Sequence, residues 1–299
     1  DSIDASLLDL KGGTTGQVLS KNSNTDMDFT WATASSSVNL LLNSNFALNQ
    51  RAYVSAANLA SGTYGFDRWK SNFTNTTLTF TASTQGQSLT INSGGGLQQI
   101  IEQGLVPSGT YTLSWTGTAT ARVYNSGGTP PSYAASPVTF TADGTANVVV
   151  EFTASGATKT VSKVQFNAGT GTTWSLATPT LQSELAACQR YYQRYNFPTA
   201  TGGGTNVGTA VNTTIFDTLI IPPVAFRVAP TAIDSLTLSM FYPPAGGQYN
   251  TGAFTIASFS TTNHIDIRYT HGSAVFTAGM GGYLTSSGNN GYLGLTAEL

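Results

Sequence analysis

The chain has unusually little charge. Only 9% of its 299 residues are Asp, Glu, Lys or Arg, against about a quarter in an average soluble domain. Its 12 basic residues are scattered singly and the formal net charge is -2, so the chain lacks the basic footprint of a nucleic-acid-binding protein. With 11% aromatic residues, it also lacks the composition of a disordered chain. We expect a folded protein whose surface is made polar by Ser, Thr, Asn, Gln and Gly.

Disulfides and membrane-spanning runs are absent as well. The single cysteine, Cys188, excludes an internal disulfide framework, and we expect it to be a small buried hydrophobe. The longest apolar runs, such as Thr218–Val224, contain proline and fall far short of the roughly 18 residues of a membrane helix. We therefore expect no membrane insertion. The chain begins at Asp1 and shows no signal peptide, as a fragment or a processed product would.

Short alternating segments dominate the sequence and predict an all-β protein. Between residues 39 and 182 they recur at intervals of roughly 8 to 14 residues, separated by Gly, Ser, Asn or Pro, which predicts an antiparallel, jelly-roll-like β-sandwich. The irregular stretch Asn125–Ser136 should be a surface loop. The predicted strands are Thr76–Ala82, Ser88–Asn92, Gly94–Ile101, Thr110–Trp115, Ala119–Tyr124, Val138–Thr141, Ala146–Phe152, Val161–Asn167 and Thr173–Leu176.

Residues 183–299 predict a bridge helix followed by a second, smaller β domain that forms a C-terminal tip. Ser183 is the expected N-cap of a short helix that ends near Gln189 and is followed by a strand. The apolar stretch up to Leu299 suggests a tail tucked into a sheet or an oligomer interface. The remaining predicted strands are Gly208–Thr214, Phe216–Val224, Leu236–Tyr242, Phe254–Phe259, His264–Thr270, Ser273–Ala278 and Gly291–Thr296.

Residues 1–38 form a separate N-terminal segment with two predicted strands, Gln17–Ser20 and Asp28–Ala32. A segment below about 40 residues cannot bury a core of its own without metals, disulfides or partner chains. Because no disulfide is available, a partner chain is the simplest solution. We therefore expect a stem that holds several copies of the chain together.

Polar residues give weak signals for catalysis. A glycosidase needs two carboxylates that face each other. After Asp67 the sandwich region contains only Glu102, Asp143 and Glu151, and their positions in the sequence do not indicate a catalytic pair. The two histidines, His264 and His271, lie at an odd offset that puts them on opposite faces of a strand. We assign no catalytic and no metal-binding residues. A structural Ca²⁺ ion bound mainly by carbonyl oxygens stays open as the one possible cofactor.

Aromatic residues at the edges of loops give the best binding signal. The faces of Tyr and Trp rings stack on the C–H faces of sugars, while amides and hydroxyls bond the sugar hydroxyls. The alternative is that these rings pack over their own loops, and Trp69 and Trp115 are expected in the core. The candidate carbohydrate-binding residues are Tyr124, Tyr133, Tyr242, Tyr249, Tyr283 and Tyr292.

A series of motifs along the chain resembles the receptor-binding tail fibres of bacteriophages. GTTGQVLS and FTWAT look like the joint between shaft and head, and LNSNFALNQR, YGFDRW, LQQIIE and SGTYTLSWTGTATARVY look like the jelly-roll head. LAACQRYYQRY looks like the bridge after it, and FRVAPT and LGLTAEL look like the C-terminal tip. Within Leu42–Trp69, we expect Arg51, Asp67, Arg68 and Trp69 to be framework residues that lock the head onto its stem.

This resemblance implies a homotrimer located in the virion as an extracellular tail appendage. It implies attachment to other tail or baseplate proteins through the N-terminal end, and recognition of a polysaccharide on the host surface. We expect a fibre protein that binds this glycan without cleaving it. Two alternatives remain open: a depolymerase that cleaves the glycan, and a capsid decoration or spacer fibre that has no receptor.

Overall fold

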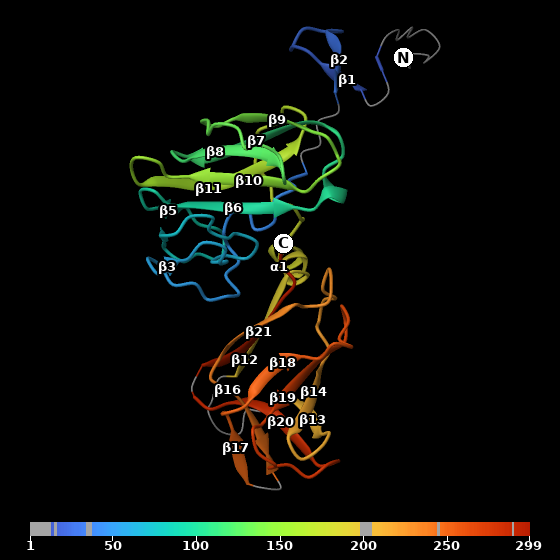
Figure 1. The fold of residues 1–299 in the computed structure, drawn as a ribbon. Helices are drawn as coiled ribbons and strands as arrows, with labels where there is room; N and C mark the ends of the chain where they lie inside the picture. Colours follow the sequence, from blue (N-terminus) through green and yellow to red (C-terminus); the bar gives the residue numbers. More distant parts are fainter. Residues whose placement is uncertain (1–12, 15–16, 34–37, 198–204, 244–245, 289) are drawn as a thin grey trace, which may run out of the picture.

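The structure is a computed structural model that describes residues 13–14, 17–33, 38–197, 205–243, 246–288 and 290–299. It confirms the all-β prediction: its described strands pair antiparallel, and one α-helix lies among them. Figure 1 shows two stacked β units, the first coloured blue to green and the second orange to red. No helix in the described part of the chain is long and apolar enough to cross a membrane.

The N-terminal segment contains the predicted hairpin. Strand β1 (Gln17–Lys21) pairs with β2 (Phe29–Thr33), each within one residue of its predicted limits. Asp28 closes the turn, where its carboxylate accepts hydrogen bonds from the side chains of Asn22 and Ser23. The rest of the predicted stem, residues 1–12, 15–16 and 34–37, lies outside the described residues.

The first β unit is a sandwich of a six-stranded and a three-stranded sheet, as predicted. The strand orders are β3-β4-β5-β11-β7-β9 and β6-β10-β8. The six-stranded sheet contains β3 (Asn58–Leu59), β4 (Thr76–Thr79), β5 (Leu89–Ile91), β11 (Lys159–Ala168), β7 (Gly109–Gly117) and β9 (Val138–Ala142); the other contains β6 (Gly96–Ile101), β10 (Val148–Thr153) and β8 (Thr120–Asn125).

Aromatic packing fills the space between these sheets. The ring of Phe152 lies 6.0 Å from that of Trp69 and 5.1 Å from that of Trp115, and all three side chains are buried. Trp69 is in the core as expected, although an irregular segment carries it there. Full burial of such a side chain contributes about 1.5–3 kcal/mol, so this cluster stabilises the contact between the two sheets.

The bridge is a helix, α1 (Leu181–Gln189), that starts before the predicted residue. Its N-cap is Thr180, whose hydroxyl accepts a hydrogen bond from the amide of Ser183 at 3.1 Å. Ser183 returns the interaction by accepting from the Thr180 amide, which completes a capping box. The prediction of Ser183 as N-cap was therefore wrong by three positions, because a second hydroxyl residue upstream competes for the same role. Cys188 is buried, as expected.

The second β unit contains a three-stranded and a seven-stranded sheet, in the orders β12-β21-β15 and β17-β16-β20-β13-β14-β19-β18. The smaller sheet contains β12 (Tyr192–Phe197), β21 (Gly291–Thr296) and β15 (Ala232–Leu236). The larger contains β17 (Gly247–Tyr249), β16 (Leu238–Tyr242), β20 (Gly281–Ser286), β13 (Thr205–Ala210), β14 (Ile215–Ile220), β19 (Ile265–Thr270) and β18 (Ala253–Ile256).

Several strand predictions were wrong in detail. The segments Thr173–Leu176 and Ser273–Ala278 are irregular, whereas β20, an interior strand of the larger sheet between β16 and β13, was missed. The predicted strand Leu236–Tyr242 is divided between two sheets at Thr237, whose backbone φ of 49° interrupts β geometry. Glycines at the start of β20 hid its strand character, because glycine is rare in strands.

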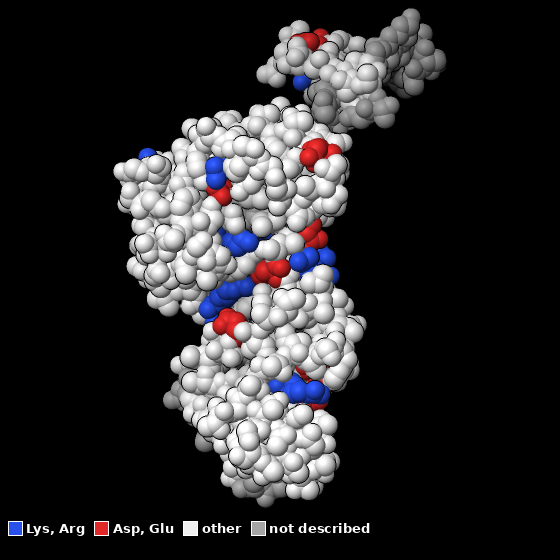
Figure 2. Space-filling view, viewed as in Figure 1, with Lys and Arg blue, Asp and Glu red and all other residues white. Residues whose placement is uncertain are grey.

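A cluster of charged residues joins the two β units. Figure 2 shows Lys and Arg beside Asp and Glu at the waist between them, with smaller charged groups above and below. Glu298 follows β21 and forms ion pairs with Arg51, at 3.3 Å, and with Arg68. The Arg68 guanidinium lies against the ring of Tyr191, with its carbon 3.6 Å from the ring centroid. The C-terminal residues therefore dock on the sandwich.

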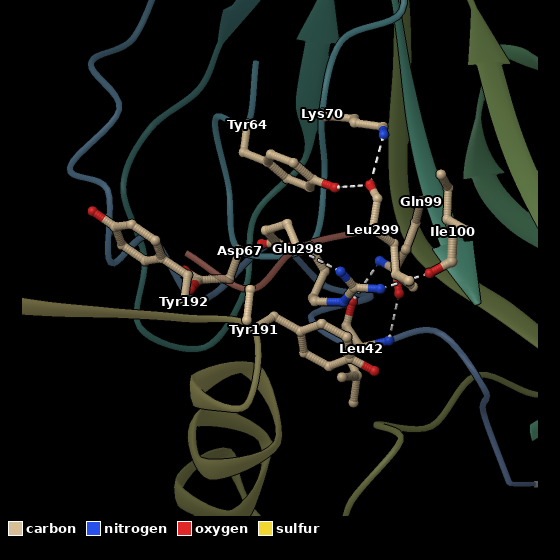
Figure 3. Close-up of polar contacts among 12 residues, drawn as sticks. Leu42, Tyr64, Asp67, Lys70, Gln99, Ile100, Tyr191, Tyr192, Glu298 and Leu299 are labelled. Carbon is tan, nitrogen blue, oxygen red and sulfur yellow. Dashed lines mark hydrogen bonds and ion pairs between the residues drawn. The ribbon is translucent and has the colours of Figure 1, made fainter. Parts of the chain in front are cut away.

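Two further side chains of this cluster donate hydrogen bonds to Leu299. Tyr64 and Lys70 each donate a hydrogen bond to the main-chain oxygen of Leu299, at 2.8 Å (Figure 3). Arg51 and Arg68 are thus framework residues, as predicted, but they join the sandwich to the second β unit and not to the stem. Asp67 has a different role: its buried carboxylate accepts hydrogen bonds from Gln50, and burial raises its pKa.

Candidate functional site

Two of the six candidate tyrosines lie together on the three-stranded sheet of the sandwich. Tyr124 and Tyr133 both donate a hydrogen bond to Glu151, the first at 3.3 Å. The guanidinium of Arg122 lies over both rings, 5.5 Å and 4.3 Å from their centroids, and pairs with the same carboxylate at 2.5 Å. Burial and the bond to Glu151 raise the pKa of Tyr133. This group ties the Asn125–Ser136 loop to the sheet.

The other four candidates lie in three places in the second β unit. Tyr242 and Tyr249 pack on Phe276, with ring centroids 5.2 Å and 5.5 Å away. Tyr283 stacks on Phe241 at 5.1 Å. Tyr292 donates to Asp234 at 2.9 Å, and the Arg194 guanidinium covers its ring at 3.7 Å. The structure therefore does not bring the six tyrosines into one site, and their role in sugar binding stays a prediction.

The carboxylates considered for catalysis have structural partners. Glu102 accepts a hydrogen bond from Tyr191 at 2.8 Å, and Asp143 accepts bonds from Asn125 and from the Thr145 amide, both at 2.7 Å. Glu151 is held by the arginine and tyrosines of its cluster. Across the described residues, no group of three or more His, Cys, Asp or Glu side chains could hold a metal ion.

A pocket on the sandwich combines an aromatic wall with amide and hydroxyl groups. Its volume is about 220 Å³. Four segments meet there: the one around Asn45, the connection between β4 and β5, the middle of β11, and the irregular segment that carries Trp174. The lining residues are Asn45, Gln85, Gly86, Gln87, Ser88, Ser162, Lys163 and Trp174. We identify this pocket, the Trp174 pocket, as the candidate functional site.

A β-bulge in β11 places one wall of the pocket. The register with β7 shifts between Ser162 and Gln165, and Lys163 within the shift has a backbone φ of 48°. The next amide, of Val164, donates to the Ser44 carbonyl at 2.9 Å. A bulge re-aims the side chain of its extra residue. Here it leaves Lys163 exposed beside the pocket while Val164 stays in the core.

Trp174 forms the aromatic wall. Its indole N–H donates to the Ser44 hydroxyl at 3.2 Å, which fixes the half-buried ring. The same ring borders a second, more open hollow of about 540 Å³, lined also by Val38 and residues 175–179. Lys163 Nζ lies 5.9 Å from the ring centroid. One tryptophan thus separates two adjoining hollows on the same surface.

Amide groups form the floor. Asn45 Nδ2 donates to the Gln85 carbonyl at 3.3 Å, and Gln87 Nε2 donates to the Phe46 carbonyl at 2.8 Å. Gln87 Oε1 is buried and accepts no hydrogen bond within the described part of the chain. Gly86 has a φ of 103°, and a Cβ there would lie 2.7 Å from Asn45 Nδ2. Only glycine therefore leaves this floor undisturbed.

The sequence contained signals for this pocket that were missed. Trp174 was assigned to a strand, yet its surroundings, TGTTWS, show no apolar alternation. In VSKVQFN the apolar positions change from the odd to the even residues between Val161 and Val164, as a bulge requires. Both signals are local. Nothing in the sequence showed that the two segments meet beside Asn45.

Comparisons with known proteins do not identify the chain. No family model matches it, and no curated protein matches it. It is similar to a crystal structure of a cycloisomaltooligosaccharide glucanotransferase from Paenibacillus sp. complexed with cycloisomaltoheptaose, with 9% identity and a TM-score of 0.22, over 83% of this chain and 46% of that one. The chain thus spans about half of that protein's length. A likeness at this TM-score carries no conclusion about function.

Proposed function

We propose that this chain is the subunit of a virion tail fibre, and that it binds a host-surface glycan in the Trp174 pocket without cleaving it. The observation that carries the proposal is the indole face of Trp174 beside the amides of Asn45 and Gln87. This pairing suits a sugar, because the ring can cover the C–H face of a pyranose while polar groups bond its hydroxyls. The motifs that resemble phage fibres supply the biological setting.

The composition of the pocket favours binding over hydrolysis. Glycoside hydrolysis requires a pair of carboxyl groups about 5 to 10 Å apart. The lining residues of the Trp174 pocket include no Asp or Glu. The carboxylates elsewhere in the sandwich are held by hydrogen bonds, as described above. The alternative is a depolymerase, which an assay for shortened polysaccharide chains would detect.

A trimer would make one shallow site useful, because linked copies raise the effective concentration at the surface. The number of three copies comes from the resemblance to phage fibres, and an apolar row across three strands of the larger second-unit sheet supports a contact between copies. Tyr283 pairs in register with Phe241 on one side and Val207 on the other, and Val207 is 78% exposed. Equilibrium sedimentation tests it: the proposal predicts three times the chain mass, and a monomer contradicts it.

Affinity electrophoresis through gels that contain host-surface polysaccharide tests the binding proposal. We expect the wild-type protein to be retarded and Trp174→Ala to migrate as in a gel without polysaccharide. The matched control is Phe259→Ala, which removes an aromatic ring that is 55% exposed on the second β unit. Equal retardation of both variants would overturn the assignment of the site. Shortened polysaccharide would favour a depolymerase, and no retardation of wild type on any host glycan would favour a spacer.

A further inference from the structure

We infer that the Trp174 pocket selects a sugar that carries an anionic group, a carboxylate or a phosphate, and that Lys163 is the residue that recognises it. This inference deepens the proposed function and rests on it. It goes beyond stacking, because a tryptophan with amides would accept a neutral sugar equally well.

Lys163 gives the pocket a positive charge, and none of the described lining residues carries a negative one. Lys163 is the charged member of its lining residues, and the others are amides, hydroxyls, a glycine and the tryptophan. Five arginines of the chain pair with carboxylates: Arg51, Arg68, Arg122, Arg227 and Arg268. Lys163 forms no such ion pair within the described residues. In a chain with only 12 basic residues, an unpaired ammonium beside an aromatic wall is available to a ligand.

The backbone conformation of Lys163 is energetically unfavourable. Its φ of 48° is a left-handed conformation, which costs a residue with a Cβ about 1–2 kcal/mol relative to ordinary geometry. Asn, Asp or Gly would adopt this conformation more easily, so the local backbone does not explain a lysine here. The bulge turns the side chain away from the core and toward Trp174. A function for the ammonium group accounts for the choice of residue.

The distances suit a substituted pyranose. Lys163 Nζ is 5.9 Å from the indole centroid, so a sugar stacked on the ring brings an exocyclic carboxylate or phosphate within reach of the ammonium group. The hollow on the other side of Trp174 gives room for the neighbouring sugars, so the pocket suits an internal unit of a polymer.

Isothermal titration with matched polymers tests the inference. The probes are oligogalacturonate, the same oligomer fully methyl-esterified, and a poly(glycerol phosphate) glycan. We expect wild type to bind an anionic probe about tenfold more tightly than the ester, as a charge-assisted hydrogen bond would provide. Lys163→Gln should remove this preference, so that it binds the anionic probe and the ester with equal affinity. Added salt should weaken anionic binding in wild type only. Comparing oligogalacturonate with the poly(glycerol phosphate) glycan shows whether the pocket prefers a carboxylate or a phosphate.

Lys159→Gln, in the same strand, is the matched control and should behave as wild type. Equal affinity of wild type for anionic and neutral probes, or an unchanged preference in Lys163→Gln, would overturn this inference and leave the proposed function intact. Trp174→Ala separates the two claims: if it binds the probes as wild type does, the proposed site is wrong. If wild type binds none of the probes, the inference is wrong as well.

Discussion

Replacing Glu298 by glutamine should destabilise the contact between the two β units. The substitution keeps the size of the side chain but removes the charge that compensates Arg68, whose side chain is 3% exposed. Breaking one partner of a buried pair costs about 3–5 kcal/mol. Arg68 keeps its bond to the Ile100 carbonyl and its stacking on Tyr191, so we expect a loss near the lower limit, about 3 kcal/mol.

Urea unfolding, followed by circular dichroism and tryptophan fluorescence, measures this loss in a double-mutant cycle with Arg68→Met. We expect the double variant to be less destabilised than the sum of the single ones, with a coupling of about 2 kcal/mol. Asp143→Asn makes the same chemical change at an exposed turn and should cost less. A loss below about 0.5 kcal/mol for Glu298→Gln, or strictly additive effects, would refute the role of this ion pair in joining the units.

Two further predictions concern stability, and a third concerns glycan binding. Thr180→Ala should cost about 1 kcal/mol in urea unfolding, because it removes the helix cap, whereas Thr180→Ser should cost little. Gly86→Ala should weaken glycan binding in the electrophoretic assay by displacing Asn45, and unchanged retardation would contradict the described floor. Burial raises the folded-state pKa of both Tyr191 and Tyr195 to about 12, so stability should be full below about pH 10 and fall as the pH rises toward 12. A flat urea midpoint over that alkaline range would contradict it.

Local patterns predicted the fold class because alternation and turns are local properties. The strands of the sandwich were found to within a few residues wherever apolar side chains alternate, as in β7 and β10. Strand β20 was missed because it begins with glycines, which are rare in strands. The folded chain explains why glycine is present, since a Cβ at Gly282 would lie 2.6 Å from the Phe241 carbonyl. That close approach depends on a neighbouring strand, which no local pattern encodes.

The candidate site shows the same limit more clearly. Tyrosines at loop edges were chosen from their positions in the sequence, but their hydroxyls and faces are used by distant partners, such as Glu151 and Arg194. Trp174 and Asn45 are 129 positions apart and meet through Ser44, so only the folded chain brings them together. The sequence carried a separate signal for the bulge and for an irregular segment around Trp174, but no signal that the two lie close together.

Saturation-transfer NMR detects directly whether an isolated glycan binds at Trp174. Host-surface oligosaccharide is mixed with the wild-type protein, and its C–H protons are observed while protein resonances are saturated. We expect transfer to one pyranose face in wild type, no transfer with Trp174→Ala, and an oligosaccharide of unchanged length at the end. Equal transfer with Trp174→Ala, or shortened oligosaccharide, would contradict it.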